Sequence, residues 1–201
     1  MRAEEVVLVL LAAGRSTRMG AAGNKLEQPL RGRPLGLHVA EALAAVPFRA
    51  RYAVVAPGNT LDYAALGLDT VVNDDPVRDL SSSLRLGVRR ARSHDPTAVL
   101  VALADMPLVT AAHVRRVTDA GDGDEALVAS SDGNRPSPPA LFGRAHFAAL
   151  DAATGDAGAR ALIRTARPVV AGADELIDVD TPEELARLCG RARRGVTARS
   201  G

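Results

Sequence analysis

Residues 6–14 read VVLVLLAAG, in which six apolar residues of strand type (6–11) are followed by small residues. A strand that is apolar at every position is buried on both faces, which is typical of a parallel sheet covered by helices. Further runs of this kind follow along the chain: YAVVA (52–56), TVVN (70–73) and AVLVALA (98–104). The opening stretch therefore predicts the first strand of a parallel α/β sheet.

Segments with helical spacing alternate with these strands, as expected for an α/β fold. We expect helices at 34–46, 80–93, 144–152 and 157–166, a short helical piece at 61–66, a segment EALVAS at 125–130 followed by a Pro-rich connection at 133–142, and an apolar segment at 175–180. Thr181, Pro182 and Glu184 begin the last helix, with Thr as cap, Pro first and Glu third. Residues 1–190 are expected to form a single domain, followed by a basic flexible tail at 191–201.

Composition excludes several classes of protein. Hydrophobic residues make up 47% and charged residues 24% of the chain, and the net charge is +1, so no bulk field favours nucleic acid or an anionic membrane. Cys189 is the single cysteine, which excludes an intramolecular disulfide and a Cys-based metal site. Glu4 and Glu5 stand where a signal peptide carries positive charge, and the apolar run is far shorter than the about 20 residues of a spanning helix. We therefore expect a cytoplasmic protein.

The loop after the first strand, LAAGRSTRMGAAGNKL (11–26), contains Lys25, the single lysine among 25 Lys and Arg residues. It matches neither the P-loop pattern nor the dinucleotide fingerprint, because its glycines are at 14, 20 and 23. An ordinary strand-to-helix turn is the simplest alternative. Small side chains at 12–14, however, allow backbone N–H groups to approach a phosphate that nearby cations neutralise. We interpret the loop as a candidate phosphate site.

Carboxylates follow two other apolar segments. Asp105 comes directly after the strand at 98–104, and Asp178 and Asp180 close the segment at 175–180. Thr110 is the better cap for the next helix, which leaves Asp105 without a capping role. Carboxylates at strand ends beside a cationic loop suit Mg²⁺ held together with substrate phosphates. A His-ligated metal is not expected, because the four histidines are scattered.

These motifs resemble those of the MobA-like NTP transferases. The chain is similar to that family at LAAGRSTRMG and NKL in the loop, at ALADMPLV (102–109) and at DVDTPEEL (178–185). DLSSSLRLGV (79–88) and GDAGARALI (155–163) further resemble the molybdenum cofactor cytidylyltransferase branch. The resemblance implies a three-layer Rossmann-like nucleotide-diphospho-sugar transferase fold, in which a mostly parallel sheet contains one antiparallel strand.

The resemblance also implies roles for individual residues. The residues implied to contact the nucleotide are Leu11, Ala12, Ala13, Gly14, Arg18, Lys25 and Ser82. Asp105 and Asp180 are the implied metal ligands. Lys25, Arg18 and Asp105 are the implied catalytic residues. Arg135 and Arg160 are candidates for binding an anionic acceptor. Ala13 replaces the second glycine that is usual in the guanylyltransferases, which favours CTP over GTP. The implied activity is Mg²⁺-dependent transfer of CMP to a phosphorylated acceptor such as molybdopterin, with pyrophosphate released and a molybdoenzyme as a potential partner.

Two other classes of function stay open at this point. Proteins of the same branch have been described as NAD(P)H-dependent oxidoreductases of the nicotine blue type, although the chain contains no G-x-G-x-x-G. An accessory protein of a molybdoenzyme, with a decayed transferase site, is the other alternative. The acceptor also stays open, because this chain reads GNRPSPPALF (133–142) where cofactor-processing members typically read R-G-H-P.

Overall fold

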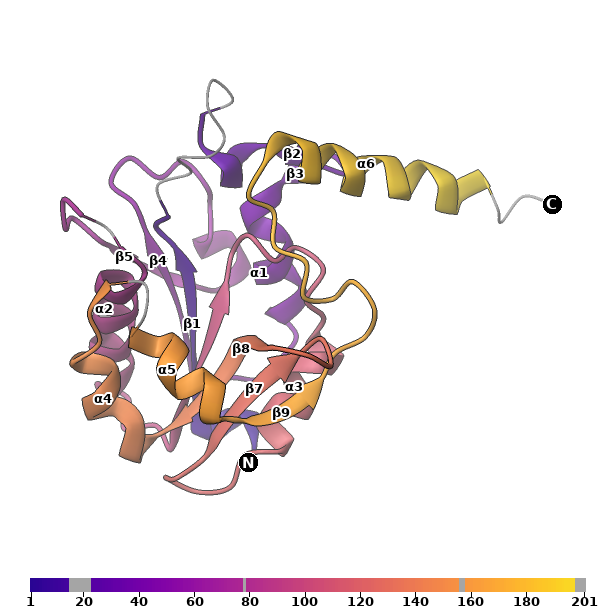
Figure 1. Cartoon of the computed structure of the whole chain (residues 1–201). Coiled ribbons are helices and arrows are strands. Elements are labelled where there is room, and N and C mark those ends of the chain that lie inside the picture. Colours follow the sequence, from indigo (N-terminus) through magenta and orange to yellow (C-terminus); the bar gives the residue numbers. More distant parts are fainter. Residues whose placement is uncertain (15–22, 78, 156–157, 198–201) are drawn as a thin grey trace.

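The computed structural model describes residues 1–14, 23–77, 79–155 and 158–197, which form a central sheet with helices on both sides (Figure 1). The strands of the sheet are β1 (Val6–Ala12), β4 (Ala50–Val55), β5 (Asp69–Val72), β6 (Ala98–Leu103), β7 (Leu127–Ser131), β8 (Pro136–Gly143) and β9 (Arg167–Val170). A small hairpin consists of β2 (Pro29–Leu30) and β3 (Arg33–Pro34). The α-helices are α1 (His38–Leu43), α2 (Leu80–Arg92), α3 (Ala111–Asp119), α4 (Phe147–Asp151), α5 (Gly158–Thr165) and α6 (Pro182–Thr197). Short 3₁₀ helices are η1 (Ala3–Glu5), η3 (Lys25–Glu27), η4 (Leu35–Leu37), η5 (Ala64–Leu66) and η6 (Arg144–His146).

The sheet has the strand order β5-β4-β1-β6-β8-β7-β9. Neighbouring strands pair in parallel except at β8, which is antiparallel to both β6 and β7. The expectation of a mostly parallel sheet with one antiparallel strand is therefore confirmed. The carboxyl ends of β1 and β6 consequently lie at the same edge of the sheet, the upper edge in Figure 1.

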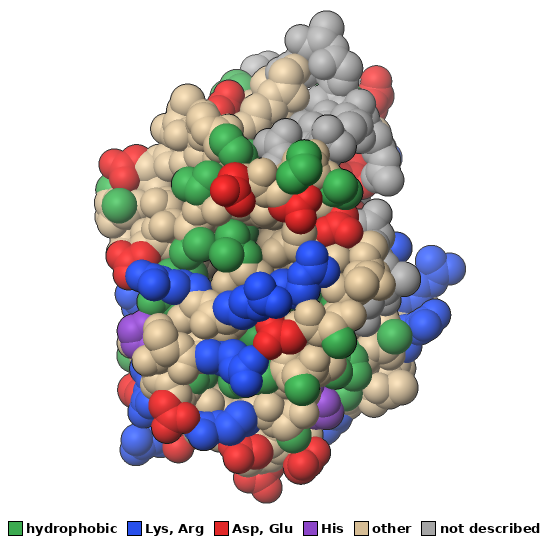
Figure 2. Space-filling view, turned by 90° about the vertical axis from the view of Figure 1, so that its left-hand side faces the viewer, with side chains coloured by type: hydrophobic (Ala, Val, Ile, Leu, Met, Phe, Trp, Pro, Cys, Tyr) green, Lys and Arg blue, Asp and Glu red, His purple; other side chains and the backbone are tan. Residues whose placement is uncertain are grey.

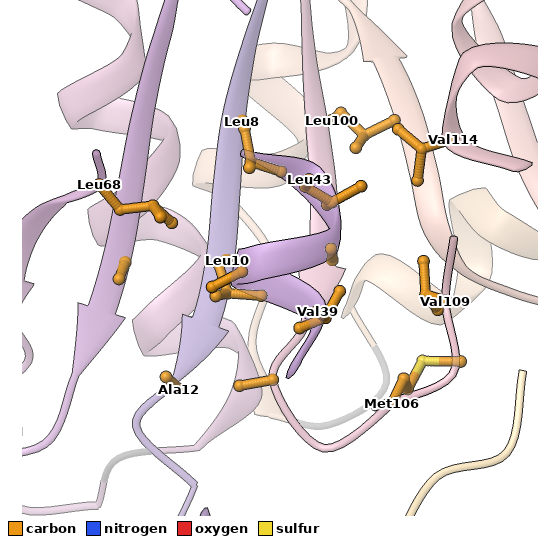
Figure 3. Packing of buried hydrophobic residues seen from close by; sticks show 14 of the residues in the cluster. Leu8, Leu10, Ala12, Val39, Leu43, Leu68, Leu100, Met106, Val109 and Val114 are labelled. Atoms are coloured by element: carbon orange, nitrogen blue, oxygen red, sulfur yellow. The ribbon is translucent and has the colours of Figure 1, made fainter. Parts of the chain in front are cut away.

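Strand β1 is buried along its whole length and divides the core into two layers. Its even-numbered residues pack in one hydrophobic cluster with α1 and α3, and its odd-numbered residues pack in a second cluster with α2, α4 and α5. Figure 3 shows the first cluster, where Leu8 and Leu10 of β1 face Val39 and Leu43 of α1. The alternation of side chains along a strand thus produces three layers, as expected for this apolar run.

Helix α2 packs directly on the sheet at Gly87. A methyl group at this position would overlap Val9 Cγ1 and lie 3.1 Å from Val54 Cγ2. We expect Gly87→Ala to lower the free energy of unfolding by about 1–3 kcal/mol, because overpacking outweighs the better helix propensity of alanine. Urea unfolding of Gly87→Ala and of Gly190→Ala measures this. Gly190 has open space around its Cβ position and should tolerate alanine, so equal effects at the two sites would contradict the packing argument.

The Pro-rich segment expected as a connection (133–142) is instead largely strand β8, which is a correction. Its prolines are Pro136, Pro138 and Pro139, and β6 pairs with β8 only from Ala140 to Gly143. Proline lacks a backbone N–H and is tolerated where a strand needs no donor on one side. The first half of β8 is therefore free of β6, and it lines the cleft described below.

Two further differences from expectation lie at the C-terminal end. The segment at 175–180 is the end of a turn at 173–176 followed by a stretch without regular secondary structure, and strand β9 precedes it at Arg167–Val170. Helix α6 continues to Thr197, so the backbone of the expected tail from residue 191 is helical as far as that residue. The start of α6 is as predicted: Thr181 N donates to Glu184 Oε2 at 2.9 Å and Glu184 N donates to Thr181 Oγ1 at 3.3 Å, a reciprocal cap.

Candidate active site

The carboxyl edge of the sheet brings Asp105 and Asp180 together although they are far apart in the chain. Ala104 N donates to Leu11 O at 3.0 Å and continues the pairing of β6 with β1 as far as Asp105. Val179 is fully buried, and its N–H donates to Asp105 O at 2.9 Å. This backbone bond, and not strand pairing, joins the segment that carries Asp180 to Asp105.

Lys25 lies between these two carboxylates. Its Nζ donates to Asp105 Oδ2 at 2.6 Å and to Asp180 Oδ1 at 2.8 Å, and the residue is only 8% exposed. Helix η3 fixes its backbone, because Asn24 accepts from Leu26 N at 3.1 Å and Leu26 is buried. The structure thus unites three of the residues that the sequence pointed to, Lys25, Asp105 and Asp180, in one ionic cluster.

The charge on Lys25 is stabilised by this cluster. Burial alone would lower the pKa of the ammonium, but the negative charge of Asp105 and the hydrogen bonds to Asp105 and Asp180 outweigh it and raise the pKa above its ordinary value. Lys25 is therefore protonated at neutral pH and acts as a counter-ion to both carboxylates.

Asp105 and Asp180 have the chemistry of a site for a hard divalent cation. Asp105 Oδ1 is buried and has no hydrogen-bond partner, so an oxygen donor is available there. Within the described parts of the chain, no three His, Cys, Asp or Glu side chains converge as a complete metal site. Two carboxylates suit Mg²⁺ or Mn²⁺, which keep water and substrate phosphates among their ligands. The residues therefore fit a metal that is shared with a phosphorylated substrate.

The loop residues after β1 are only partly described. Leu11, Ala12 and Ala13 are buried at the end of the strand, and the Ala13 side chain packs in the cluster on the α2 side of the sheet. Gly14 is exposed, with open space at its Cβ position. Arg18 lies outside the described residues. The predicted contacts of this loop with a nucleotide stay predictions.

Ser82 is placed by helix capping. Asp79 is the N-cap of α2 and accepts from Ser82 N at 2.7 Å, and this hydrogen bond lowers the pKa of the Asp79 carboxyl. The side-chain amide of Asn73 donates to Ser82 Oγ at 3.0 Å and to Ser83 Oγ at 2.9 Å. These bonds fix α2 at the carboxyl edge of the sheet, next to the ends of β4 and β5. Asn73 was missed by sequence reasoning, although its position at the end of the TVVN run could have indicated it.

A cleft of about 1280 Å³ opens beside the ionic cluster of Lys25, Asp105 and Asp180, on the α2 and α5 side of the sheet. Its apolar floor includes Leu11, Leu84, Leu103, Phe142 and Ile163. Arg135 and Arg160, the predicted acceptor residues, both line it, together with Arg164 and Arg187. Asp178 and Glu184 also line it, so the cleft reaches the segment that carries Asp180. Figure 2 shows the neighbouring side of the molecule, on which α2 and α4 lie, where a band of Lys and Arg side chains has apolar and acidic side chains above it. An anionic molecule with an apolar part fits this lining.

Comparisons with known proteins agree with this geometry. A family model described as MobA-like NTP transferase domain matches residues 8–171. The chain belongs to the MobA-like NTP transferase family. Purine catabolism protein PucB of Bacillus subtilis is 31% identical over 92% of this chain and 96% of its own length. Bifunctional protein GlmU of Rhodospirillum rubrum is 32% identical over 68% of this chain, which spans only 30% of GlmU.

Solved structures show the same fold. Rv0371c of Mycobacterium tuberculosis H37Rv is 30% identical with a TM-score of 0.76, over 94% of this chain and all of that one. A further Rv0371c structure, described as a complex with manganese, is 28% identical with a TM-score of 0.70, over 92% and 98% of the two chains. A nucleotidyl transferase from Methanothermobacter (Mth528) has a TM-score of 0.78 at 24% identity, over 94% and 98%. The family and the fold together assign nucleotidyl transfer as the class of activity. Among the described residues, none of the helices is long and apolar enough to span a membrane.

In this MobA-like domain, a polar network around the half-buried Glu175, which sequence reasoning missed, holds one wall of the cleft. Glu175 accepts from Gly172 N at 2.6 Å and from the Thr110 hydroxyl, and Arg116 lies 3.6 Å from it. Burial raises the pKa of Glu175, but its hydrogen bonds with Thr110 and Gly172 and the positive charge of Arg116 outweigh this effect, so the net shift is downward. Glu175 therefore anchors the loop at 171–178 to the start of α3. Thr110 also accepts from His113 N at 3.1 Å, which confirms it as the cap of α3.

His113 continues this network towards β8. Ser130 Oγ donates to Pro139 O at 2.7 Å and therefore accepts from His113 Nε2, also at 2.7 Å. His113 Nδ1 then accepts from Arg116 Nη2 at 2.9 Å. Both ring nitrogens are satisfied in the neutral form. A second proton on the ring would be buried and would face the Arg116 guanidinium. The Glu175 carboxylate, 4.0 Å from Nδ1, favours that proton.

The buried His113 should make stability depend on pH. Burial lowers the pKa of its imidazole, Glu175 raises it and Arg116 lowers it, with a net downward shift. As pH falls through about 6.5, the unfolded chain takes up a proton that the native state resists, so the free energy of unfolding should fall by up to about 1.4 kcal/mol per pH unit. Urea unfolding between pH 7.5 and 5.5 measures this. His113→Gln should flatten the fall and His146→Gln should keep it; equal slopes in wild type and His113→Gln would contradict the assignment.

Proposed function

We propose that the protein is a Mg²⁺-dependent cytidylyltransferase that transfers CMP from CTP to a phosphorylated acceptor such as molybdopterin. The observation that carries the proposal is the cluster of Lys25, Asp105 and Asp180 at the carboxyl edge of the sheet. Parallel α/β sheets bind nucleotides at this edge. The family of the chain, and the manganese complex of its relative Rv0371c, support a divalent metal at such a site.

The reaction is an in-line displacement. An oxygen of the acceptor phosphate attacks the α-phosphorus of CTP, a new P–O bond forms, the bond to the β-phosphate breaks and pyrophosphate leaves. Catalysis of this kind depends mainly on positioning and on charge stabilisation at phosphate oxygens. Asp105 and Asp180 would hold the metal, which supplies Lewis-acid stabilisation of those oxygens when bound. Lys25 would stabilise charge at the α-phosphate, and the loop that contains Arg18 would bind the leaving pyrophosphate.

The acceptor is proposed to bind in the cleft. Four arginines of its lining, Arg135, Arg160, Arg164 and Arg187, can pair with anionic groups, since the planar guanidinium matches phosphate oxygens. The apolar floor suits a ring system better than a free sugar phosphate. These two features favour molybdopterin among phosphorylated acceptors.

A screen of pyrophosphate release tests the proposal. Purified protein is incubated with CTP, GTP or ATP and Mg²⁺, each with molybdopterin or with simple phosphorylated acceptors. Release is expected with CTP, molybdopterin and Mg²⁺ together, and not when EDTA removes the metal. Release with GTP and not with CTP would replace CTP by GTP as the proposed nucleotide. Absence of release with every combination would overturn the proposal and favour the NAD(P)H-dependent or accessory alternatives.

A further inference from the structure

We propose that the Lys25 ammonium occupies the cation position between Asp105 and Asp180 before nucleotide binds, keeps free divalent metal out, and leaves the carboxylates when metal and nucleotide enter together. This inference rests on the proposed function and adds an order of binding to it. Metal alone should bind weakly, whereas metal and NTP should bind cooperatively.

The ammonium and a bridging metal need the same place between the carboxylates. One nitrogen atom, Lys25 Nζ, lies within hydrogen-bond distance of an oxygen from each carboxylate. A metal that bridges the same two carboxylates would also lie between them, close to Lys25 Nζ even where it binds Asp105 through Oδ1. Ammonium and metal therefore compete for one place, and two cations held there together would repel each other at short range.

Charge is left uncompensated in this cluster when either cation leaves. The Lys25 side chain is 10% exposed, and those of Asp105 and Asp180 are 21% and 30% exposed. Removing one partner from a largely buried ionic cluster leaves uncompensated charge, which is costly. Lys25 can therefore leave the two carboxylates readily only when another cation replaces it, and a metal can enter readily only when Lys25 has a new anionic partner. NTP phosphates provide that partner, so the exchange couples the two ligands.

The exchange requires movement of the Lys25 side chain alone. The backbone at Lys25 is held by the Asn24 cap and by the buried side chain of Leu26. Lysine has an unbranched, flexible stem and a compact ammonium without preferred planar pairing. All the other residues among the 25 Lys and Arg of this protein are arginines. Arginine pairs with carboxylates through a planar fork and would leave them less easily. This gives a physical reason for the single lysine of the chain.

Binding of Mn²⁺, followed by electron paramagnetic resonance of the free ion, tests the inference with and without CTP. We expect wild type to bind Mn²⁺ at least tenfold more tightly in the presence of CTP. Lys25→Met, which keeps the stem and removes the charge, should bind Mn²⁺ without CTP at least tenfold more tightly than wild type. Adding Asp180→Asn to Lys25→Met should abolish this gain and so locate the ion.

The outcomes separate the inference from the proposed function. If Lys25→Met binds Mn²⁺ without CTP no more tightly than wild type, while both bind it with CTP, the inference is overturned and the proposed function stands. Absence of a Mn²⁺ site in both proteins, with or without CTP, overturns both. Thermal unfolding provides a second measurement where Lys25→Met is unstable: Mn²⁺ alone should raise its Tm more than that of wild type, and an equal rise in both counts against the inference.

Discussion

Asp105→Asn is expected to lower the rate of pyrophosphate release by at least about 10³-fold, because loss of metal stabilisation removes several kcal/mol and each 1.4 kcal/mol is tenfold. The substitution keeps the shape of the side chain and removes its charge. Asp105 Oδ2 is paired with Lys25, and Asp105 Oδ1 is the buried oxygen without a partner. The variant therefore loses a proposed ligand of the metal and half of the counter-charge of Lys25.

The fold should persist in this variant, because the contacts that build the edge come from the backbone. Val179 N donates to the carbonyl of Asp105 and Ala104 N donates to Leu11 O, and neither bond involves the carboxylate. Turnover is measured across a Mg²⁺ titration, with urea unfolding as the check on the fold. Asp119→Asn, an exposed residue at the end of α3, is the matched control and should keep wild-type turnover. A folded Asp105→Asn variant with more than a tenth of wild-type turnover would remove Asp105 from the proposed mechanism.

Local sequence patterns predicted the parts of this fold that depend on local physics. The unbroken apolar run at 6–11 identified a strand buried on both faces, and β1 is buried at every position. The Thr-Pro-x-Glu pattern at 181–184 identified the start of α6, where the cap has the expected hydrogen bonds. The strand at 98–104 indicated that Asp105 would lie at the carboxyl edge of the sheet. Asp180 does lie beside it, but not as the end of a strand: the segment at 175–180 is outside the sheet and reaches Asp105 through the bond from Val179 N.

Contacts between residues far apart in the chain could not be predicted from such local patterns. The cations of the loop at 11–26 were expected to face phosphates. Lys25 instead pairs with Asp105, 80 residues away, and with Asp180, 155 residues away. Strand β8 was missed because prolines usually indicate a connection. They fit a strand here because the first half of β8 does not pair with β6 and needs no backbone N–H donors on that side. The Glu175 anchor was missed since its partners, Gly172 excepted, belong to α3 and its cap. In each case the deciding partner lies on another element, and no spacing in the sequence encodes it.

Lys25→Ala is expected to lower turnover by about 10²–10³-fold, the cost of removing one preorganised donor from the transition state. Lys25→Arg should not restore activity, since the planar fork pairs with the carboxylates and cannot follow a phosphate whose geometry changes during transfer. Turnover at saturating Mg²⁺ and CTP isolates this loss from weaker binding. Arg33→Ala removes only an exposed ion pair with Glu41 and should leave turnover unchanged. Because Lys25 is proposed both to exclude free metal and to stabilise the reacting phosphate, its loss should strengthen Mn²⁺ binding and weaken catalysis in the same variant. A Lys25→Ala variant with wild-type turnover would show that the single lysine of this chain serves the unloaded site alone.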